Sequence, residues 1–323
     1  MHTSHIQVPE RVLNLVESSN ATYLIHSDQY ANWVFDPTHP TQGRRFINAK
    51  NFLADQMAGT NSPLVIVEPR PATRAELNRI HSSEYIDEVL ESHTSDQWAG
   101  ARSDLSELAA LFAGGTLVAL DSLLTGKAKT AIHFPGAKHH AQYDYSSGFC
   151  IFADFALAAE IATKDHGKRV AILDIDAHHG DGTENLTADN PNVLTFSIHE
   201  KGIFPGTGLY DESENYIYNA PLDSSTGKGD GALLTAVERF ISLNRDFEAN
   251  LLFIAAGADG HAEDPLSSLQ FSLDGCREVA SRIRDAFPEV PILVGGAGGY
   301  LPDTGTPEVW AAVASELSRQ VTG

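Results

Sequence analysis

The chain has 323 residues, of which 43 are Asp or Glu and 22 are Lys or Arg, so its formal net charge is −21. An apolar share of 42% is enough for a large buried core and excludes a wholly disordered chain. The negative charge disfavours nucleic acid as a partner, because phosphates would be repelled, and favours cationic small molecules or lysine-rich peptides.

Short apolar runs predict the strands of a sheet. In chain order these runs occupy residues 22–26, 64–67, 130–134, 170–173, 193–198, 251–256 and 292–294. Helix-length amphipathic stretches lie between them, at residues 106–124, 154–166, 231–244 and 274–286. Continuous apolar runs are typical of strands that are buried on both faces of a parallel sheet. The alternation predicts a single α/β domain over residues 1–323, with a largely parallel central sheet flanked by helices.

Features of a membrane or exported protein are not evident in the sequence. No run approaches the about 18 consecutive apolar residues of a membrane helix, and charged residues interrupt the N-terminal 20 residues, unlike a secretory leader. Cys150 and Cys276 lie far apart and form no CxxC motif, so neither a disulfide framework nor a cysteine zinc site is indicated. We therefore expect a cytoplasmic protein.

Residues capable of catalysis follow several of the predicted strands. In parallel α/β sheets the ligand crevice lies outside the carboxyl ends of the strands. Five of these ends carry such residues: His139 and His140, residues 174–181, Ser197 to His199, Asp259, and Tyr300. The sequence therefore predicts a functional site at this edge of the sheet.

Asp174, Asp176 and His178 stand at alternate positions. If the chain stays extended there, the three side chains share one side of the strand. Two such ligands, with Asp259 from another strand, would form a catalytic zinc site, in which the metal polarises a carbonyl and lowers the pKa of water. The alternative is that these aspartates accept hydrogen bonds from backbone amides in their loops.

The histidine pair and the tyrosine complete a hydrolytic arrangement. His139 or His140 could act as general base and then as general acid, each with a carboxylate behind it to fix its tautomer. Asp174 and Asp181 are the candidates for those carboxylates. Tyr300 follows a glycine-rich run, where its hydroxyl could donate to a developing oxyanion.

These residues occur in motifs that resemble those of the histone deacetylase and acetylpolyamine amidohydrolase superfamily, and the motifs follow one another in the same order as in that family. The superfamily has an arginase-like α/β fold. The motifs are His139-His140-Ala141, Gly148-Phe149-Cys150, residues 174–183, Phe204-Pro205-Gly206-Thr207-Gly208, Gly257-Ala258-Asp259, Asp264-Pro265-Leu266 and Gly298-Gly299-Tyr300. The resemblance runs from about residue 60 to the C-terminus. The first 60 residues are similar only loosely, since this chain carries His39-Pro40-Thr41-Gln42 where many members have His-Pro-Glu-Arg-Pro.

The resemblance implies a role for each of these residues. The zinc ligands would be Asp176, His178 and Asp259, and Tyr300 would polarise the amide carbonyl. His140 would be the general base and acid, supported by Asp181, and His139 its electrostatic partner, supported by Asp174. Phe149 and Phe204 would wall a narrow channel, with Gly148 against the substrate's methylene stem and Leu266 at the rim. A structural potassium ion would use Asp174, Ser197 and the carbonyl of Ile198.

The resemblance implies a zinc-dependent deacetylase whose partner is acetyl-lysine in a protein or peptide, or an acetylated polyamine. We favour acyl-lysine, because no obvious long insertion narrows the channel mouth. Residues 92–106 are the one candidate for such an insertion. A binuclear manganese ureohydrolase shares the fold, but Gly180 stands where such enzymes need a carboxylate. A non-catalytic acyl reader would lack a ligand or the tyrosine, and none is missing.

Overall fold

A computed structural model describes residues 21–223 and 225–321, so the expectation about the N-terminal 20 residues lies outside the described part. The strands are β1 (Thr22–Ile25), β2 (Leu64–Val67), β3 (Thr130–His133), β4 (Val170–Asp174), β5 (Val193–Glu200), β6 (Ile217–Leu222), β7 (Leu251–Ala255) and β8 (Ile292–Gly295). They form one sheet in the order β2-β1-β3-β8-β7-β4-β5-β6, and each neighbouring pair is parallel. The predicted α/β domain with a parallel sheet is confirmed.

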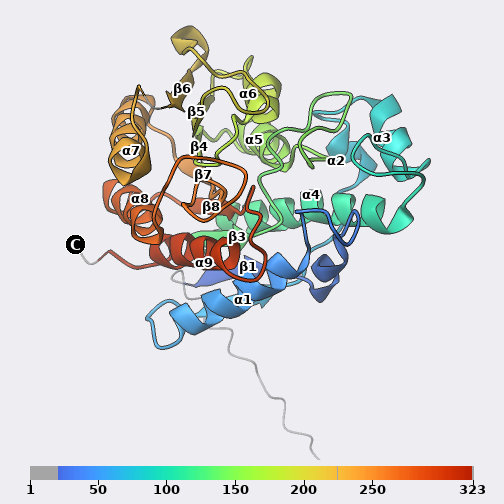
Figure 1. Cartoon of the computed structure of the whole chain (residues 1–323), viewed down its shortest axis with the longest axis horizontal. Helices are drawn as coiled ribbons and strands as arrows, with labels where there is room; N and C mark the ends of the chain where they lie inside the picture. Colours follow the sequence, from blue (N-terminus) through green and yellow to red (C-terminus); the bar gives the residue numbers. More distant parts are fainter. Residues whose placement is uncertain (1–20, 224, 322–323) are drawn as a thin grey trace, which may run out of the picture.

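Helices cover both faces of this sheet. They are α1 (Arg44–Met57), α2 (Arg74–Leu77), α3 (Ser83–Leu90), α4 (Ser103–Leu124), α5 (Asp154–Lys164), α6 (Asp181–Thr187), α7 (Gly229–Phe247), α8 (Leu273–Ala286) and α9 (Gly305–Leu317), with short 3-10 turns at Asp28–Asn32 and Ser213–Asn215. Helices α1, α9, α8 and α7 pack side by side in one layer, and α4, α5 and α6 form another. Figure 1 shows α7 and α8 on one side of the strands and α5 on the other.

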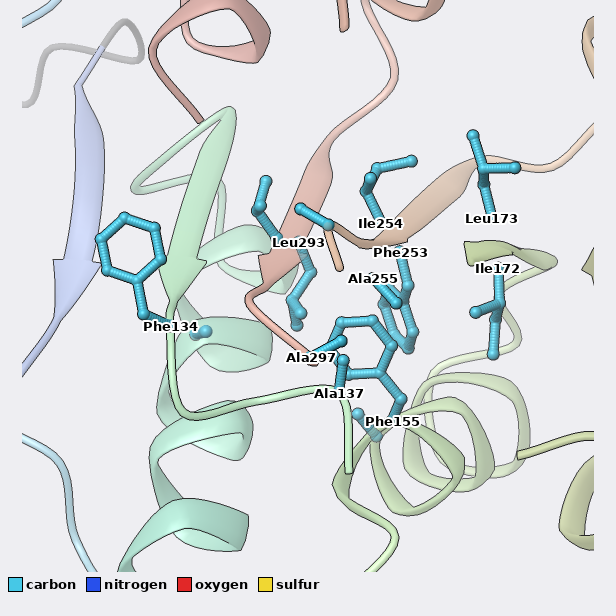
Figure 2. Packing of buried hydrophobic residues seen from close by; sticks show 14 of the residues in the cluster. Phe134, Ala137, Phe155, Ile172, Leu173, Phe253, Ile254, Ala255, Leu293 and Ala297 are labelled. Atoms are coloured by element: carbon cyan, nitrogen blue, oxygen red, sulfur yellow. The ribbon is translucent and has the colours of Figure 1, made fainter. Parts of the chain in front are cut away.

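The core lies where these layers meet the central strands. Every residue of β3, β4, β7 and β8 is buried, as continuous apolar runs predict. Phe155 of α5 packs against Phe253 of β7 with ring centres 5.3 Å apart (Figure 2). A side chain at Gly295 would meet Phe155 and Ala137 at 2.8 Å, so this glycine lets the loop after β3 approach the end of β8.

The edge strands β2 and β6 are less buried than the central strands, and β6 was not predicted from the sequence. In β2, Val65 and Ile66 are exposed, because no described strand pairs with its outer side. β6 was not predicted, since its sequence contains Asn219 and Pro221, and proline is confined mainly to edge strands. Helices α1, α2, α3, α6 and α9 were also missed, whereas the four predicted helices are present as α4, α5, α7 and α8.

Helix α4 is long and apolar, although charged residues interrupt its sequence. By length and composition alone it could cross a membrane, but 72% of its most apolar window is buried inside the fold. It packs against α5 and against β1 and β3. Its apolar character is therefore explained by its place in the core, and the cytoplasmic location stays a prediction.

Candidate active site

Three of the predicted metal ligands meet where β4 and β7 end side by side. Asp176, His178 and Asp259 offer ligand atoms that all lie within 4.8 Å of one another. The Nδ1 atom of His178 is 2.9 Å from Oδ2 of Asp259 and 3.1 Å from Oδ1 of Asp176. Both carboxylates are almost completely buried. The sheet order thus joins ligands that are about eighty residues apart in sequence.

The chain does not stay extended after β4, so the condition for placing Asp174, Asp176 and His178 on one side of a strand is not met. The strand ends at Asp174, and the chain then turns, because the Asp176 amide donates to Asp174 Oδ1 at 3.0 Å and the His178 amide donates to Asp176 Oδ1 at 2.9 Å. These two turns separate Asp174 from the ligand triad. Aspartate side chains commonly bond backbone amides two residues on, so this local signal was present in the sequence.

The charges of the triad fit a divalent cation. Burial and the charge of Asp176 raise the pKa of Asp259 above its usual range. Burial lowers the pKa of His178, but the hydrogen bonds that its ring donates to Asp176 and Asp259 outweigh burial and raise that pKa to about 11. Two close, buried carboxylates need a positive charge between them. Two carboxylates and one imidazole are also a donor set that zinc accepts.

Each histidine of the predicted pair has its own carboxylate. His139 Nδ1 lies 2.6 Å from Asp174 Oδ2, and His140 Nδ1 lies 2.7 Å from Asp181 Oδ1. Burial lowers the pKa of His139, but the charges of Asp174 and Asp176 outweigh burial and raise it to about 9. Burial and the charge of His139 lower the pKa of His140 to about 4. At neutral pH His139 is therefore protonated and His140 is a free base.

Hydrogen bonds hold both polar groups of the peptide bond between Gly299 and Tyr300. The Tyr300 amide donates to Asp264 Oδ2 at 2.8 Å, and the preceding carbonyl, of Gly299, accepts from Arg45 Nη1 at 2.6 Å. Gly299 has φ of 147° and approaches Thr306 so closely that a side chain would clash. Burial and the charges of Asp259 and Asp176 raise the pKa of the Tyr300 hydroxyl. The phenol therefore stays neutral and able to donate.

A channel of about 330 Å³ leads from the surface to these groups. It is lined by Gln97, His140, Gly148, Phe149, His178, Phe204, Leu266 and Tyr300. Phe204 is 50% exposed and Leu266 39%, which puts them at the mouth. A side chain at Gly148 would meet the His140 ring at 2.3 Å, so glycine is needed there. The structure thus brings together all the channel residues that the sequence indicated.

Several residues of the site carry no recognisable signal in a single sequence. Gln97 Oε1 accepts a 2.8 Å hydrogen bond from the amide of Phe149, whose φ is +65°, and so helps to fix the aromatic wall. Arg45 and Asp264 hold the backbone around Tyr300. Asp264 stands in the Asp264-Pro265-Leu266 motif, but the motif does not indicate its bond to the Tyr300 amide. Gln97 and Arg45 stand in no motif, and their partners are distant in the chain, so no local pattern could identify them.

The remaining predicted residues also lie near this edge of the sheet. Asp174 of β4 pairs in register with Ser197 of β5, and Ile198 is the next residue of that strand. Ser197 Oγ lies 3.0 Å from His199 Nδ1. Potassium at these residues stays a prediction. A side chain at Gly180 would meet Asp174 at 2.5 Å, so a carboxylate for a second metal does not fit there without rearrangement.

Comparison with known proteins relates the chain to one family. Residues 39–317 match the histone deacetylase domain. The chain is similar to the acetoin utilization protein AcuC of Staphylococcus aureus (strain MRSA252), with 32% identity over 93% of this chain and 82% of the relative. It is also similar to AcuC of Bacillus subtilis (strain 168), with 32% identity over 91% and 81%. A probable deacetylase of Archaeoglobus fulgidus is 29% identical over 92% and 88%.

A solved structure extends the similarity to three dimensions. The crystal structure of the HDA15 HD domain superposes with a TM-score of 0.81 and 26% identity, and the match covers 92% of this chain and 90% of that one. The structural similarity therefore spans most of the chain, and the family match over residues 39–317 includes every strand end that carries a residue of the site.

Proposed function

Because the chain belongs to the histone deacetylase family, we propose that it is a zinc-dependent amidohydrolase that removes acetyl groups from acyl-lysine in proteins or peptides. The observation that carries the proposal is the buried triad of Asp176, His178 and Asp259 at the inner end of the channel. It is accompanied by a neutral histidine and a neutral tyrosine, which are the groups that amide hydrolysis needs.

The residues in and around the channel have different roles in the reaction. Asp176, His178 and Asp259 would hold zinc, which when bound polarises the substrate carbonyl and makes water more acidic. His140 accepts the proton of the attacking water at Nε2, since Asp181 engages Nδ1. The Tyr300 hydroxyl donates to the carbonyl oxygen as negative charge develops there. The proton held by His140 then passes to the departing amine.

A small acetylated amine is the second candidate substrate. It is favoured by the relatives that are named for acetoin utilization, a name that refers to a small metabolite. Against it, Phe204 and Leu266 are partly exposed at the mouth, and an open mouth can accept a peptide on either side of the lysine. Both substrates would present the same acetamide and methylene stem to the channel.

The test is kcat/KM of the zinc-loaded enzyme for an acetyl-lysine peptide, N-acetylputrescine and N-acetylspermidine. A preference of tenfold or more for the peptide, about 1.4 kcal/mol in transition-state binding, supports the protein substrate. The reverse preference moves the assignment to small amines. Hydrolysis of none of the three by an enzyme that binds zinc contradicts the proposed deacetylation.

A matched pair of variants tests the site itself. Tyr300→Phe should retain zinc and lose at least 100-fold in kcat, because it removes the oxyanion donor. Tyr218→Phe, on strand β6, is the control and should behave as wild type. Full activity of Tyr300→Phe would overturn the role of this hydroxyl.

A further inference from the structure

A second, smaller cavity lies behind the channel. Its volume is about 20 Å³, and its lining includes Thr41, Arg45, Lys138 and Cys150. Four residues, His140, Gly148, Phe149 and Tyr300, line both this cavity and the channel. It therefore continues the channel past the groups that would handle the reacting carbonyl. A substrate whose acyl group enters the channel first would point that group toward this inner cavity.

This inner cavity is bordered by two buried cations. Lys138 is 6% exposed and Arg45 is 2% exposed. Within residues 21–223 and 225–321 neither side chain forms an ion pair with a carboxylate. The Lys138 Nζ atom lies 5.5 Å from the centre of the Phe112 ring, and Nε of Arg45 has no hydrogen-bond partner.

The backbone at Lys138 is held by a buried carboxylate. The amides of Ala137 and Lys138 donate to the buried carboxylate of Asp154 at 3.0 and 2.7 Å, and Ala137 has φ of +63°. Burial lowers the pKa of Lys138 to about 8, so the side chain is still mainly protonated at pH 7. The acyl end of the site is therefore lined by a residue with a buried, poorly solvated ammonium group.

We propose that Lys138 determines the acyl specificity of the enzyme, so that the inner cavity accepts an acetyl group and rejects longer apolar acyl groups. This inference rests on the proposed deacetylation. A cavity of about 20 Å³ has room for roughly one water-sized group, such as the methyl of an acetyl group. A propionyl or butyryl chain would place further methylene groups against an unpaired charge, which is unfavourable.

The experiment compares one lysine peptide that carries acetyl, propionyl or butyryl, or the corresponding acylputrescines if the small amine is the better substrate. For the wild type, kcat/KM should fall at least 30-fold from acetyl to butyryl. Lys138→Met removes the charge with little change of length and should raise the butyryl-to-acetyl ratio at least tenfold. Lys138→Arg keeps the charge and should keep the acetyl preference. Lys127→Met, at an exposed lysine, is the control.

Equal use of acetyl and butyryl by the wild type, or an unchanged ratio in Lys138→Met, overturns the inference while leaving the proposed deacetylation intact. Failure to hydrolyse any acyl group contradicts the proposed function instead. A binding measurement tests the cavity even then, and also if Lys138→Met does not fold. By calorimetry the wild type should bind acetate at least tenfold more tightly than butyrate, and equal or reversed affinities would refute the role of Lys138.

Discussion

Asp181 determines which nitrogen of His140 carries the proton. Its Oδ1 atom lies 2.7 Å from Nδ1 of His140, and its Oδ2 accepts from Nε2 of Gln142 at 3.0 Å. A carboxylate in this position accepts the Nδ1 hydrogen and leaves Nε2 free to accept a proton. The geometry of one hydrogen bond thus selects the tautomer that a general base needs.

Asp181→Asn should lower kcat about 100-fold, because the amide can accept the same hydrogen bond but removes the charge that supports the imidazolium. KM should change less than about threefold, since Asp181 does not line the channel. Steady-state kinetics on the preferred substrate measures both values. Asp144→Asn, at an exposed position of the loop that carries His140, is the control. A kcat within twofold of the wild type would contradict this role.

His81 lies between helices α2 and α3. Its ring forms hydrogen bonds at both ends of the loop that carries Gly148 and Phe149. Its Nδ1 atom is 2.8 Å from the carbonyl of Gln142, and its Nε2 accepts from the amide of Ala153, just before α5, at 3.0 Å. Because Nε2 accepts a hydrogen, Nδ1 must be the donor, and the ring is neutral. Burial lowers the pKa of His81 to about 4. Protonation would break the bond to Ala153.

This histidine should make the fold less stable in mild acid. Its pKa is about 4 when folded and about 6.5 when unfolded, so the unfolded chain binds more protons between these values. Its contribution is complete above pH 6.5 and is lost as the pH falls toward 4. By pH 5 the loss is about 2 kcal/mol.

Urea unfolding at pH 7 and pH 5 measures the difference. The wild type should lose about 2 kcal/mol more than His81→Gln between these two pH values. His166→Gln removes an exposed histidine and should follow the wild type. The same pH dependence in the wild type and His81→Gln would show that His81 does not titrate on unfolding.

The sequence predicts those elements whose signal is local. Buried strands such as β4 and β7 are recognisable from their apolar runs, because both faces of each strand meet helices. The edge strand β6 was missed because Asn219 and Pro221 interrupt any such run. The aspartates that form the turns after Asp174 are also visible in the sequence, as the alternative in which they accept hydrogen bonds from backbone amides.

Across the whole molecule, motifs identified the residues of the site but not their supports. The triad, the histidine pair and Tyr300 stand in strong motifs at strand ends, and the parallel sheet brings those ends to one edge. Arg45 and Gln97 act through backbone groups of residues 299 and 149. Lys138 owes its environment to Phe112 and Arg45. Such contacts depend on the tertiary fold and leave no periodicity or spacing in the chain.

The order of strands has a consequence for synthesis of the chain on the ribosome. β2, β1 and β3 form one end of the sheet and β4, β5 and β6 the other, and only β8 and β7 join them. Until residues 251–295 have been translated, β3 and β4 therefore present open, apolar edges, which favour aggregation. A chain that ends at residue 250 should be digested rapidly in limited proteolysis, whereas the full chain resists, and equal resistance would contradict late closure. Asp259 lies within this segment and Tyr300 follows it by five residues, so the nascent protein completes its active site directly after its sheet.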